Sequence, residues 1–185
     1  MNALLIIDLQ KDFLPGGALP APEGDRIIPV INRIMGQFDT VLASKDWHPE
    51  KSGHFERWPP HCIRDTEGAQ FADHFNEGFL TKVFLKGTGM KDDGYSAFEA
   101  TSDDLDSYLK ANGIRDLFLA GLTTEYCVKA TALDAVDRGY RTVVIKDAVA
   151  GVNARPGDPE KALQEMEAGG VVIAGTDRLD LNARQ

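Results

Sequence analysis

A cysteine, Cys127, lies where a predicted strand gives way to a predicted helix. The apolar run at 116–120 predicts a buried strand, and residues 128–138, rich in alanine, predict a helix that ends at Gly139. Cys127 is therefore expected in the first helical turn, where free backbone N–H groups and the helix dipole favour an anion. This position predicts a lowered thiol pKa, and the thiolate is the form that attacks carbonyl carbons. The alternative is a small buried cysteine that packs like alanine.

Two charged residues follow other predicted strands. The apolar run 3–7 ends at Asp8, and the run 82–85 ends at Lys86. A lysine ammonium would stabilise both a thiolate and an ionised Asp8. Asp8 could take the proton of the Cys127 thiol and later deliver it to a departing amine. Taken singly, Asp8 is better explained as a loop cap and Lys86 as a solvated strand end, but together with Cys127 at one sheet edge they favour a cysteine hydrolase.

A second group of residues has the composition of a metal site. Asp46 and His48 are two positions apart, which places them on the same side of an extended chain, and His61 and His54 come from the following loop. Carboxylate oxygen and imidazole nitrogen suit one divalent metal ion, and zinc, iron and manganese all fit. Turn-forming aspartate and surface histidines are the alternative. Three of the four histidines fall within residues 48–61, which favours the metal, with His54 the least certain ligand.

Three aromatic residues, Phe13, Trp58 and Tyr95, fall on predicted loops near these groups. They would sandwich a flat ring if they face a common pocket, and they would be ordinary hydrophobic packing if they do not. The remaining histidine, His74, is expected at the surface. Cys62 is expected to be a small buried side chain.

Apolar strands alternate with amphipathic helices along the chain. Strands are expected at 3–7, 40–44, 82–85, 116–120, 142–145 and 171–174, and helices at 25–35, 102–112, 128–138 and 158–168. This order predicts an α/β fold, a doubly wound and mostly parallel six-stranded sheet with helices on both faces. Ligands bind beyond the carboxyl ends of such strands, so the charged residues and the thiol should gather at one edge. The irregular segment 49–78 is too long to be a simple connection, which indicates a functional loop.

Length and composition narrow the functional classes. A chain of 185 residues predicts a single domain, 1–185, and two cysteines are too few for a disulfide framework. The net charge of -9 argues against nucleic acid and anionic membranes as partners. The apolar run near the start is short and is broken by Asp8, so we expect no membrane span and a cytoplasmic location. A neutral or cationic small molecule is the favoured ligand, and self-association is possible.

Together these motifs resemble the nicotinamidase/pyrazinamidase branch of the isochorismatase-like hydrolases. The resemblance rests on residues 7–13 (IDLQKDF), 15–17 (PGG), 46–49 (DWHP), 58–62 (WPPHC), 86–87 (KG), 95–98 (YSAF) and 121–128 (GLTTEYCV). It implies hydrolysis of nicotinamide to nicotinate and ammonia through a thioester on Cys127, assisted by Asp8 and Lys86. It also implies metal ligation by Asp46, His48 and His61, at a site that helps to anchor the pyridine nitrogen, and His54 matches a position that ligates in only some members.

The resemblance extends to finer features. It implies an oxyanion hole made by the backbone N–H groups of Thr123 and Cys127, a cis peptide bond before Thr123, and aromatic contacts to the ring from Phe13 and Trp58. One departure is Glu125, where aspartate is usual. Two other readings stay open: another amidase of the superfamily that cleaves a carbamoyl or ureido group, and a non-enzymatic metal- or ligand-binding protein with an inert Cys127.

Overall fold

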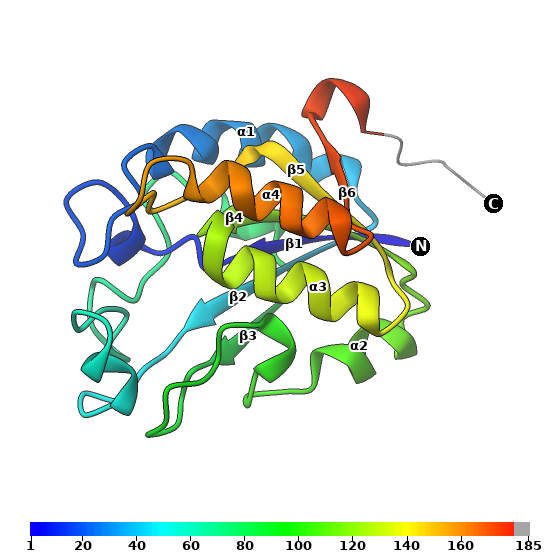
Figure 1. Cartoon of the computed structure of the whole chain (residues 1–185). Helices are drawn as coiled ribbons and strands as arrows, with labels where there is room; N and C mark the ends of the chain where they lie inside the picture. The colour runs from blue at the N-terminus through cyan, green and yellow to red at the C-terminus, as the bar shows by residue number, and fades with distance from the viewer. Residues whose placement is uncertain (180–185) are drawn as a thin grey trace.

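Six parallel strands form one sheet at the centre of the molecule (Figure 1). The computed structural model describes residues 1–179. The strands are β1 (Asn2–Ile7), β2 (Thr40–Asp46), β3 (Lys82–Lys86), β4 (Asp116–Leu122), β5 (Arg141–Ala150) and β6 (Val172–Ala174), in the order β3-β2-β1-β4-β5-β6. All five neighbouring pairs are parallel, which confirms the predicted doubly wound α/β fold.

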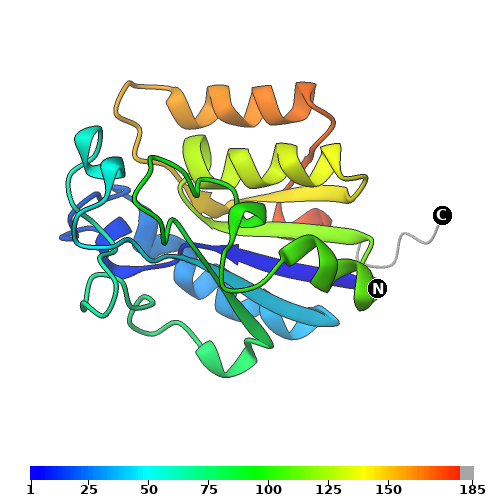
Figure 2. The same ribbon diagram turned by 90° about the horizontal axis from the view of Figure 1, so that it is seen from below.

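Helices cover both faces of the sheet because the strand residues are apolar on both sides. Leu4 and Ile6 of β1 pack into the core under α1 (Ile27–Ile34). Leu5 and Ile7 point the other way, into the core shared with α2 (Leu105–Ala111), α3 (Lys129–Asp137) and α4 (Asp158–Ala168). Figure 2 shows α3 and α4 together on one side of the sheet and α1 on the other. Continuous apolar runs are typical of strands that are buried on both faces.

Shorter helical segments connect these elements. The 3-10 turns are η1 (Lys11–Phe13), η2 (Gly24–Arg26), η3 (Met35–Gln37), η4 (Gly53–Glu56), η5 (Glu77–Phe79), η6 (Ala97–Glu99) and η8 (Thr176–Arg178), and η7 (Thr124–Val128) is a π-helical turn that runs into α3. Three of the 3-10 turns, η4, η5 and η6, lie in the long loops that flank β3.

The predicted elements are all present, with differences at their ends. The strand predicted to stop at residue 145 continues to Ala150, because β5 resumes pairing with β4 after a register shift between Leu119 and Gly121. The helix predicted from residue 102 begins later, at Leu105, because the side chain of Asp104 caps it by accepting a hydrogen bond from the backbone N–H of Ser107 (2.6 Å). The helix predicted at 158–168 has those bounds.

The strand order reverses direction between β1 and β4. The chain builds β1, β2 and β3 outward on one side and β4, β5 and β6 outward on the other, so β1 and β4 are neighbours. Such a switch point leaves a crevice beyond the carboxyl ends of the two strands. The two strands approach closely here, since a Cβ on Gly121 would lie 2.0 Å from the carbonyl oxygen of Ile7. Gly121 also has φ +110°, so glycine is required at this junction.

The tail after Asp177 is mostly polar. Residues 180–185 of this tail lie outside the described part of the chain. Within residues 1–179, no helix combines the length and the apolar character that a membrane crossing requires.

Candidate active site

The structure brings Asp8, Lys86 and Cys127 together at the carboxyl edge of the sheet. Lys86 Nζ lies 2.8 Å from Asp8 Oδ2 and 3.4 Å from Cys127 Sγ. Asp8 follows β1, Lys86 ends β3 and Cys127 lies in η7 directly after β4, so the parallel sheet delivers all three to one edge. Lys86 and Asp8 have no exposed surface, and Cys127 is 7 % exposed.

Lys86 is held as an ammonium between two carboxylates. In addition to its ion pair with Asp8, its Nζ donates hydrogen bonds to Asp46 Oδ1 (2.5 Å) and to the carbonyl oxygen of Gly94 (2.7 Å). Burial by itself would lower the pKa of Lys86, but Asp46 and Asp8 raise this pKa well above its usual value. The buried positive charge is therefore permanent at neutral pH.

The predicted lowering of the Cys127 pKa is wrong. Burial raises the pKa of the Cys127 thiol well above its ordinary value, the ammonium of Lys86 opposes this, and the negative charges of Asp8 and Asp46 reinforce it. Position in the helical turn does not outweigh removal of the thiol from water. This direction favours the thiol form of Cys127, which could act as a nucleophile only if a neighbouring base took its proton.

Asp8 has the properties of that base. Burial raises the pKa of Asp8 to about 6, and Lys86 prevents a larger rise. Its Oδ1 accepts a hydrogen bond from the hydroxyl of Ser44 (2.7 Å), which leaves Oδ2 toward Lys86. A carboxylate with a pKa just below neutrality is ionised at pH 7 and can still hold a proton for part of a catalytic cycle. Ser44, on β2, was not singled out in the sequence, where it reads as an ordinary strand residue.

The turn that carries Cys127 begins at Thr123. The peptide bond between Leu122 and Thr123 is cis, as the resemblance implies. The carbonyl oxygen of Thr123 accepts hydrogen bonds from the N–H groups of Tyr126 (3.1 Å) and Val128 (3.2 Å), which closes the turn beneath the sulfur. Thr123 and Cys127 both line the cavity described below, the placement that an oxyanion hole would need.

Glu125, the departure from the usual aspartate, ties this turn to the loop after β5. Its Oε1 accepts the backbone N–H of Asn153 (2.7 Å), and its side chain is buried. Room for the longer side chain comes from Gly151, where a Cβ would lie 2.4 Å from Glu125 Oε2. The neighbouring Val152 lines the narrow cavity described below.

The four predicted metal ligands form a second cluster next to the first. One ring nitrogen from each of His48, His54 and His61 lies within 4.8 Å of the others, and all three rings are buried. Asp46 Oδ2 lies 3.5 Å from His48 Nε2 and 3.8 Å from His61 Nε2. Asp46 thus contributes one oxygen to Lys86 and directs the other at the histidines.

Each histidine of the cluster is oriented by a hydrogen bond to an acceptor. The Nδ1 atoms contact the carbonyl oxygens of Gly87 (His48, 2.9 Å) and Pro59 (His61, 2.7 Å) and the carboxylate of Asp92 (His54, 2.6 Å). Because these acceptors carry no proton, each Nδ1 is the donor and each Nε2 keeps a free lone pair. Burial lowers the pKa of His54 and of His61, which favours the neutral imidazole that binds metal ions.

The donor set fits a divalent metal ion. His48 Nε2 is buried and has no hydrogen-bond partner among the described residues, a costly arrangement for a polar atom unless an ion takes its lone pair. One carboxylate oxygen and neutral imidazole nitrogens suit zinc, iron or manganese. The backbone of Asp46 is fixed by Gln10, whose side-chain amide accepts from its N–H and donates to its carbonyl, both at 2.8 Å. Gln10 lies in the IDLQKDF motif, but its sequence position did not reveal this clamp.

The three predicted aromatic residues line one narrow cavity above Cys127. Phe13, Trp58 and Tyr95 share it with the sulfur and with Asp46, His54 and His61. Trp58 Nε1 donates to the hydroxyl of Tyr95 (2.9 Å), and Phe13 packs against His61 with ring centroids 5.3 Å apart. The cavity is also lined by four residues that were not predicted, Leu19, Gly94, Tyr126 and Val152. As expected, His74 is exposed and Cys62 is buried.

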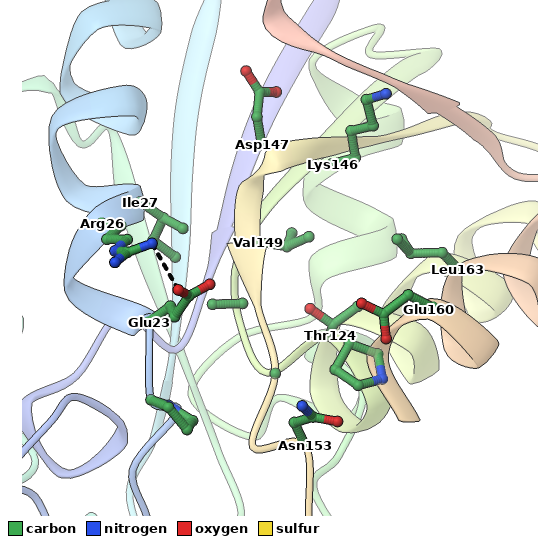
Figure 3. A pocket seen from close by; sticks show the side chains of 14 residues that line it. Glu23, Arg26, Ile27, Thr124, Lys146, Asp147, Val149, Asn153, Glu160 and Leu163 are labelled. Atoms are coloured by element: carbon green, nitrogen blue, oxygen red, sulfur yellow. Dashed lines mark ion pairs between the residues drawn. The ribbon is translucent and has the colours of Figure 1, made fainter. Parts of the chain in front are cut away.

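A larger groove of about 580 Å³ lies beside this edge, between the start of α1, the bulged end of β5 and the start of α4. Figure 3 shows the ion pair of Arg26 with Glu23, with Lys146 and Asp147 on β5 across from it. Its charged groups are of both signs, and its lining contains none of Asp8, Lys86 or Cys127. The narrow cavity over Cys127 is therefore the candidate active site.

Comparison with known proteins agrees with this geometry. The model of the isochorismatase domain matches residues 2–177. The chain belongs to the isochorismatase family. Within this family it is 38% identical to the nicotinamidase of Escherichia coli (strain K12) over 199 aligned positions, which cover 93% of each protein.

Two solved structures of the family resemble this one closely. The pyrazinamidase of Pyrococcus horikoshii in complex with zinc has a TM-score of 0.85 and 41% identity, covering 94% of this chain and 98% of that chain. The L. infantum protein PnC1 in complex with nicotinate has a TM-score of 0.90 and 32% identity, covering 97% of this chain and 95% of that chain. Both chains are matched over nearly their whole length.

Proposed function

We propose that this protein is a nicotinamidase, a cysteine amidohydrolase that converts nicotinamide, and related amides such as pyrazinamide, to the acid and ammonia. One observation carries the proposal: Cys127 Sγ lies 3.4 Å from a buried lysine that is paired with Asp8, at the floor of an aromatic cavity beside a histidine cluster. A nucleophile, a base and a flat apolar slot are the parts that hydrolysis of an aromatic amide requires. The family relatives named nicotinamidase and pyrazinamidase support this substrate class.

In the first half of the reaction Asp8 takes the proton of the thiol while the sulfur attacks the amide carbon. The negative charge that develops on the carbonyl oxygen is stabilised by the backbone N–H groups of Thr123 and Cys127. Lys86 stabilises the sulfur as it loses its proton. The tetrahedral intermediate then collapses, Asp8 delivers its proton to the departing nitrogen, and ammonia leaves a thioester on Cys127.

In the second half a water molecule attacks the thioester. Asp8, again ionised, takes a proton from this water, and the second tetrahedral intermediate expels the sulfur. The proton returns to the sulfur and the carboxylic acid product departs. Lys86 keeps its charge throughout, because its pKa is raised well above neutrality.

One divalent metal ion is part of the proposal. Asp46, His48 and His61 would hold it, and we include His54 as a fourth ligand. When bound, the ion would supply a Lewis acid for the lone pair of the ring nitrogen, away from the reacting amide. Phe13 and Trp58 would contact the faces of the ring and Tyr95 would hold Trp58 in place, as its hydroxyl does here (2.9 Å). Apolar walls with few polar groups favour a neutral heteroaromatic guest.

The test is ammonia release from nicotinamide by the purified protein, followed together with metal content. We expect turnover by the native chain and a loss of at least about 1000-fold in Cys127→Ala, with metal content and thermal stability retained. A panel of amides tests the first alternative. If a carbamoyl or ureido compound is cleaved far better than nicotinamide, the protein is a different amidase of the superfamily and this proposal is wrong. A Cys127 that is alkylated no faster than free cysteine, together with no turnover of any amide, would favour a non-enzymatic binding protein.

Cytoplasmic location, self-association and the exclusion of nucleic acid and membranes as partners stay predictions from composition. The net charge of -9 supports the exclusion of polyanions. Size-exclusion chromatography with light scattering would measure the oligomeric state.

A further inference from the structure

Two long loops meet over the active site. The β2–β3 loop carries His54 and Trp58, and the loop that follows β3 carries residues 88–96. Figure 2 shows both loops at the same end of the sheet. They approach so closely that the N–H of Gly53 donates to the carbonyl oxygen of Met90 (2.8 Å), and a Cβ on Gly53 would lie 2.8 Å from that oxygen.

Asp92 is the residue on which the contacts between these loops converge. Its Oδ1 accepts from Nδ1 of His54 (2.6 Å) and from the hydroxyl of Tyr95 (2.9 Å), and its Oδ2 accepts from Arg57 (3.0 Å). The Tyr95 hydroxyl in turn accepts from Trp58 Nε1 (2.9 Å). One carboxylate therefore fixes a histidine of the metal cluster and, through Tyr95, an aromatic wall of the cavity.

The contact with His54 decides which nitrogen that ring presents to the cluster. An ionised carboxylate only accepts, so Nδ1 of His54 carries the proton and Nε2 keeps its lone pair. The ring is stacked on His48, with centroids 4.5 Å apart and planes 20° apart, so its orientation is fixed as well as its tautomer. Carboxylates in this position on a metal-binding histidine orient the ligand and increase its basicity.

We propose that Asp92 is a positioning residue that makes His54 a metal ligand and joins the metal site to the wall of the substrate cavity. The proposal has a metal arm, the effect of Asp92 on metal binding through His54, and a substrate arm, its effect on the cavity wall through Tyr95. Only the substrate arm rests on the proposed function. The metal arm concerns the assembly of the histidine cluster, whatever amide the enzyme cleaves. Arg57 forms an ion pair with Asp92 Oδ2 (3.0 Å) on its outer side.

The metal arm is tested by measuring zinc affinity in competition with a chromophoric chelator. We expect affinity to fall about 10- to 100-fold in Asp92→Ala and less in Asp92→Asn, which keeps an acceptor oxygen. The matched control is Asp93→Asn, which removes the same charge from the neighbouring position, and its affinity should stay within about twofold of the native chain. Equal losses in the Asp92 and Asp93 variants, or native affinity in Asp92→Ala, would overturn the proposal.

A double-mutant cycle shows whether Asp92 acts through His54. If it does, His54→Ala weakens zinc binding, and adding Asp92→Ala to His54→Ala changes the affinity by less than about twofold. Full additivity of the two losses would overturn the proposal. The absorption spectrum of the cobalt-substituted protein adds a readout that a merely structural role would leave unchanged, because loss of His54 from the ion alters the ligand field. Thermal unfolding of each variant shows that the fold is retained.

The substrate arm is tested by comparing Asp92→Asn with Tyr95→Phe at saturating zinc. Tyr95→Phe removes the hydroxyl that links Asp92 to Trp58 but leaves the bond to His54, so we expect a raised KM for nicotinamide with native zinc affinity. Asp92→Asn should change both. If the native chain fails to turn over nicotinamide, the proposed function fails while the zinc measurements still decide the metal arm. Native KM in both variants would overturn the substrate arm.

Discussion

At the scale of single residues, the central feature is a lysine enclosed by acids and a thiol. Lys86 lies between Asp8, Asp46 and Cys127 with no exposed surface. Burying a charge is costly, and the cost is offset only where the partners are close and fully hydrogen-bonded. Lys86 has three donors, and its hydrogen bonds go to Asp46, the carbonyl oxygen of Gly94 and the sulfur of Cys127, while Asp8 lies beside them as an ion-pair partner.

Replacement of Lys86 should therefore affect stability as well as activity. We expect Lys86→Met to lower the free energy of unfolding by about 3–5 kcal/mol at pH 7, because two buried carboxylates are left without a counter-charge. Urea unfolding measures this. Lys82→Met is the control, since Lys82 is paired with Asp103 near the surface and its loss should cost less than about 1 kcal/mol. Equal losses in the two variants would contradict the assignment of a buried charge to Lys86.

The loss of stability in Lys86→Met should depend on pH. The pKa of Asp8 is already raised, to about 6, and removal of the lysine raises it further. A carboxyl group with a raised pKa in the folded state favours folding when protonated and opposes it as pH rises through that pKa. The destabilisation of Lys86→Met should therefore be smaller at pH 5 than at pH 7. A loss of stability that is independent of pH would show that Asp8 is not the group that loses its counter-charge in Lys86→Met.

Activity of the native chain should fall on the acid side. Protonated Asp8 cannot accept the thiol proton, so kcat/KM for nicotinamide should decrease about tenfold per pH unit below about pH 6. Because burial raises the pKa of Cys127, we expect the thiol and not a preformed thiolate to enter the reaction at neutral pH. Initial rates of ammonia release between pH 4.5 and 8 measure this profile. A rate that keeps climbing in proportion to hydroxide from pH 6 to 8 would instead indicate that thiolate formation limits the reaction without Asp8.

Most of these residues could be predicted from the sequence because the end of each buried strand is marked by the end of an apolar run. Asp8 and Lys86 follow apolar runs, and the parallel α/β pattern sends such positions to one edge. The sequence misjudged the thiol pKa because burial of an atom depends on chain segments far away in sequence. Ser44 and Asp92 were missed for a similar reason: one reads as an ordinary strand residue, and the other lies in a loop without any period.

At the scale of elements, the junction of β1 and β4 sets the positions of Asp8 and Cys127. Asp8 leaves β1 with φ +45°, and Gly121, near the end of β4, approaches Ile7 so closely that no side chain fits. The distance between β1 and β4 at Ile7 and Gly121 therefore sets how far Asp8 lies from the turn that carries Cys127. Periodicity predicts that the two strands exist, but it does not reveal how closely they pack.

A side chain at this junction should disturb both stability and chemistry. We expect Gly121→Ala to destabilise the protein by about 1–3 kcal/mol or more, through overlap with the carbonyl of Ile7 and a positive φ. Nicotinamide hydrolysis should fall in the same variant at temperatures where it is folded. Gly89→Ala is the control, because a Cβ there meets no atom within 4 Å. Native stability in Gly121→Ala would show that the junction relaxes without cost.

Element boundaries were predictable to the degree that local chemistry sets them. The helix at 158–168 was predicted with its observed bounds, since proline in its first turn and glycine after its end mark both termini. The end of β5 was not, because a bulge opposite β4 lets the strand continue past exposed Lys146 and Asp147. Such a bulge depends on the partner strand, which a single stretch of sequence does not contain.

At the scale of the whole molecule, the two clusters share Asp46. One oxygen of this carboxylate contacts Lys86 and the other faces the histidines, so the metal site and the nucleophile lie in one electrostatic field. The sheet order creates this arrangement, because β2 and β3 are neighbours and bring Asp46 and Lys86 into register. Four segments from distant parts of the sequence therefore form one site.

Because both clusters include Asp46, we expect a bound metal ion to change the pKa of the Cys127 thiol. A divalent cation held by Asp46 and the histidines adds positive charge near Cys127, which should lower the pKa of the thiol. We expect the rate of Cys127 alkylation at pH 7 to rise when the chelated protein is reloaded with zinc, by about tenfold for each unit of pKa lowering. Cys127→Ala distinguishes this reaction from any at Cys62, which is buried. Chelation should also abolish most nicotinamide turnover, and zinc, iron and manganese added singly would identify the ion that restores it. Equal alkylation rates with and without metal would mean that the two clusters, although joined through Asp46, act independently.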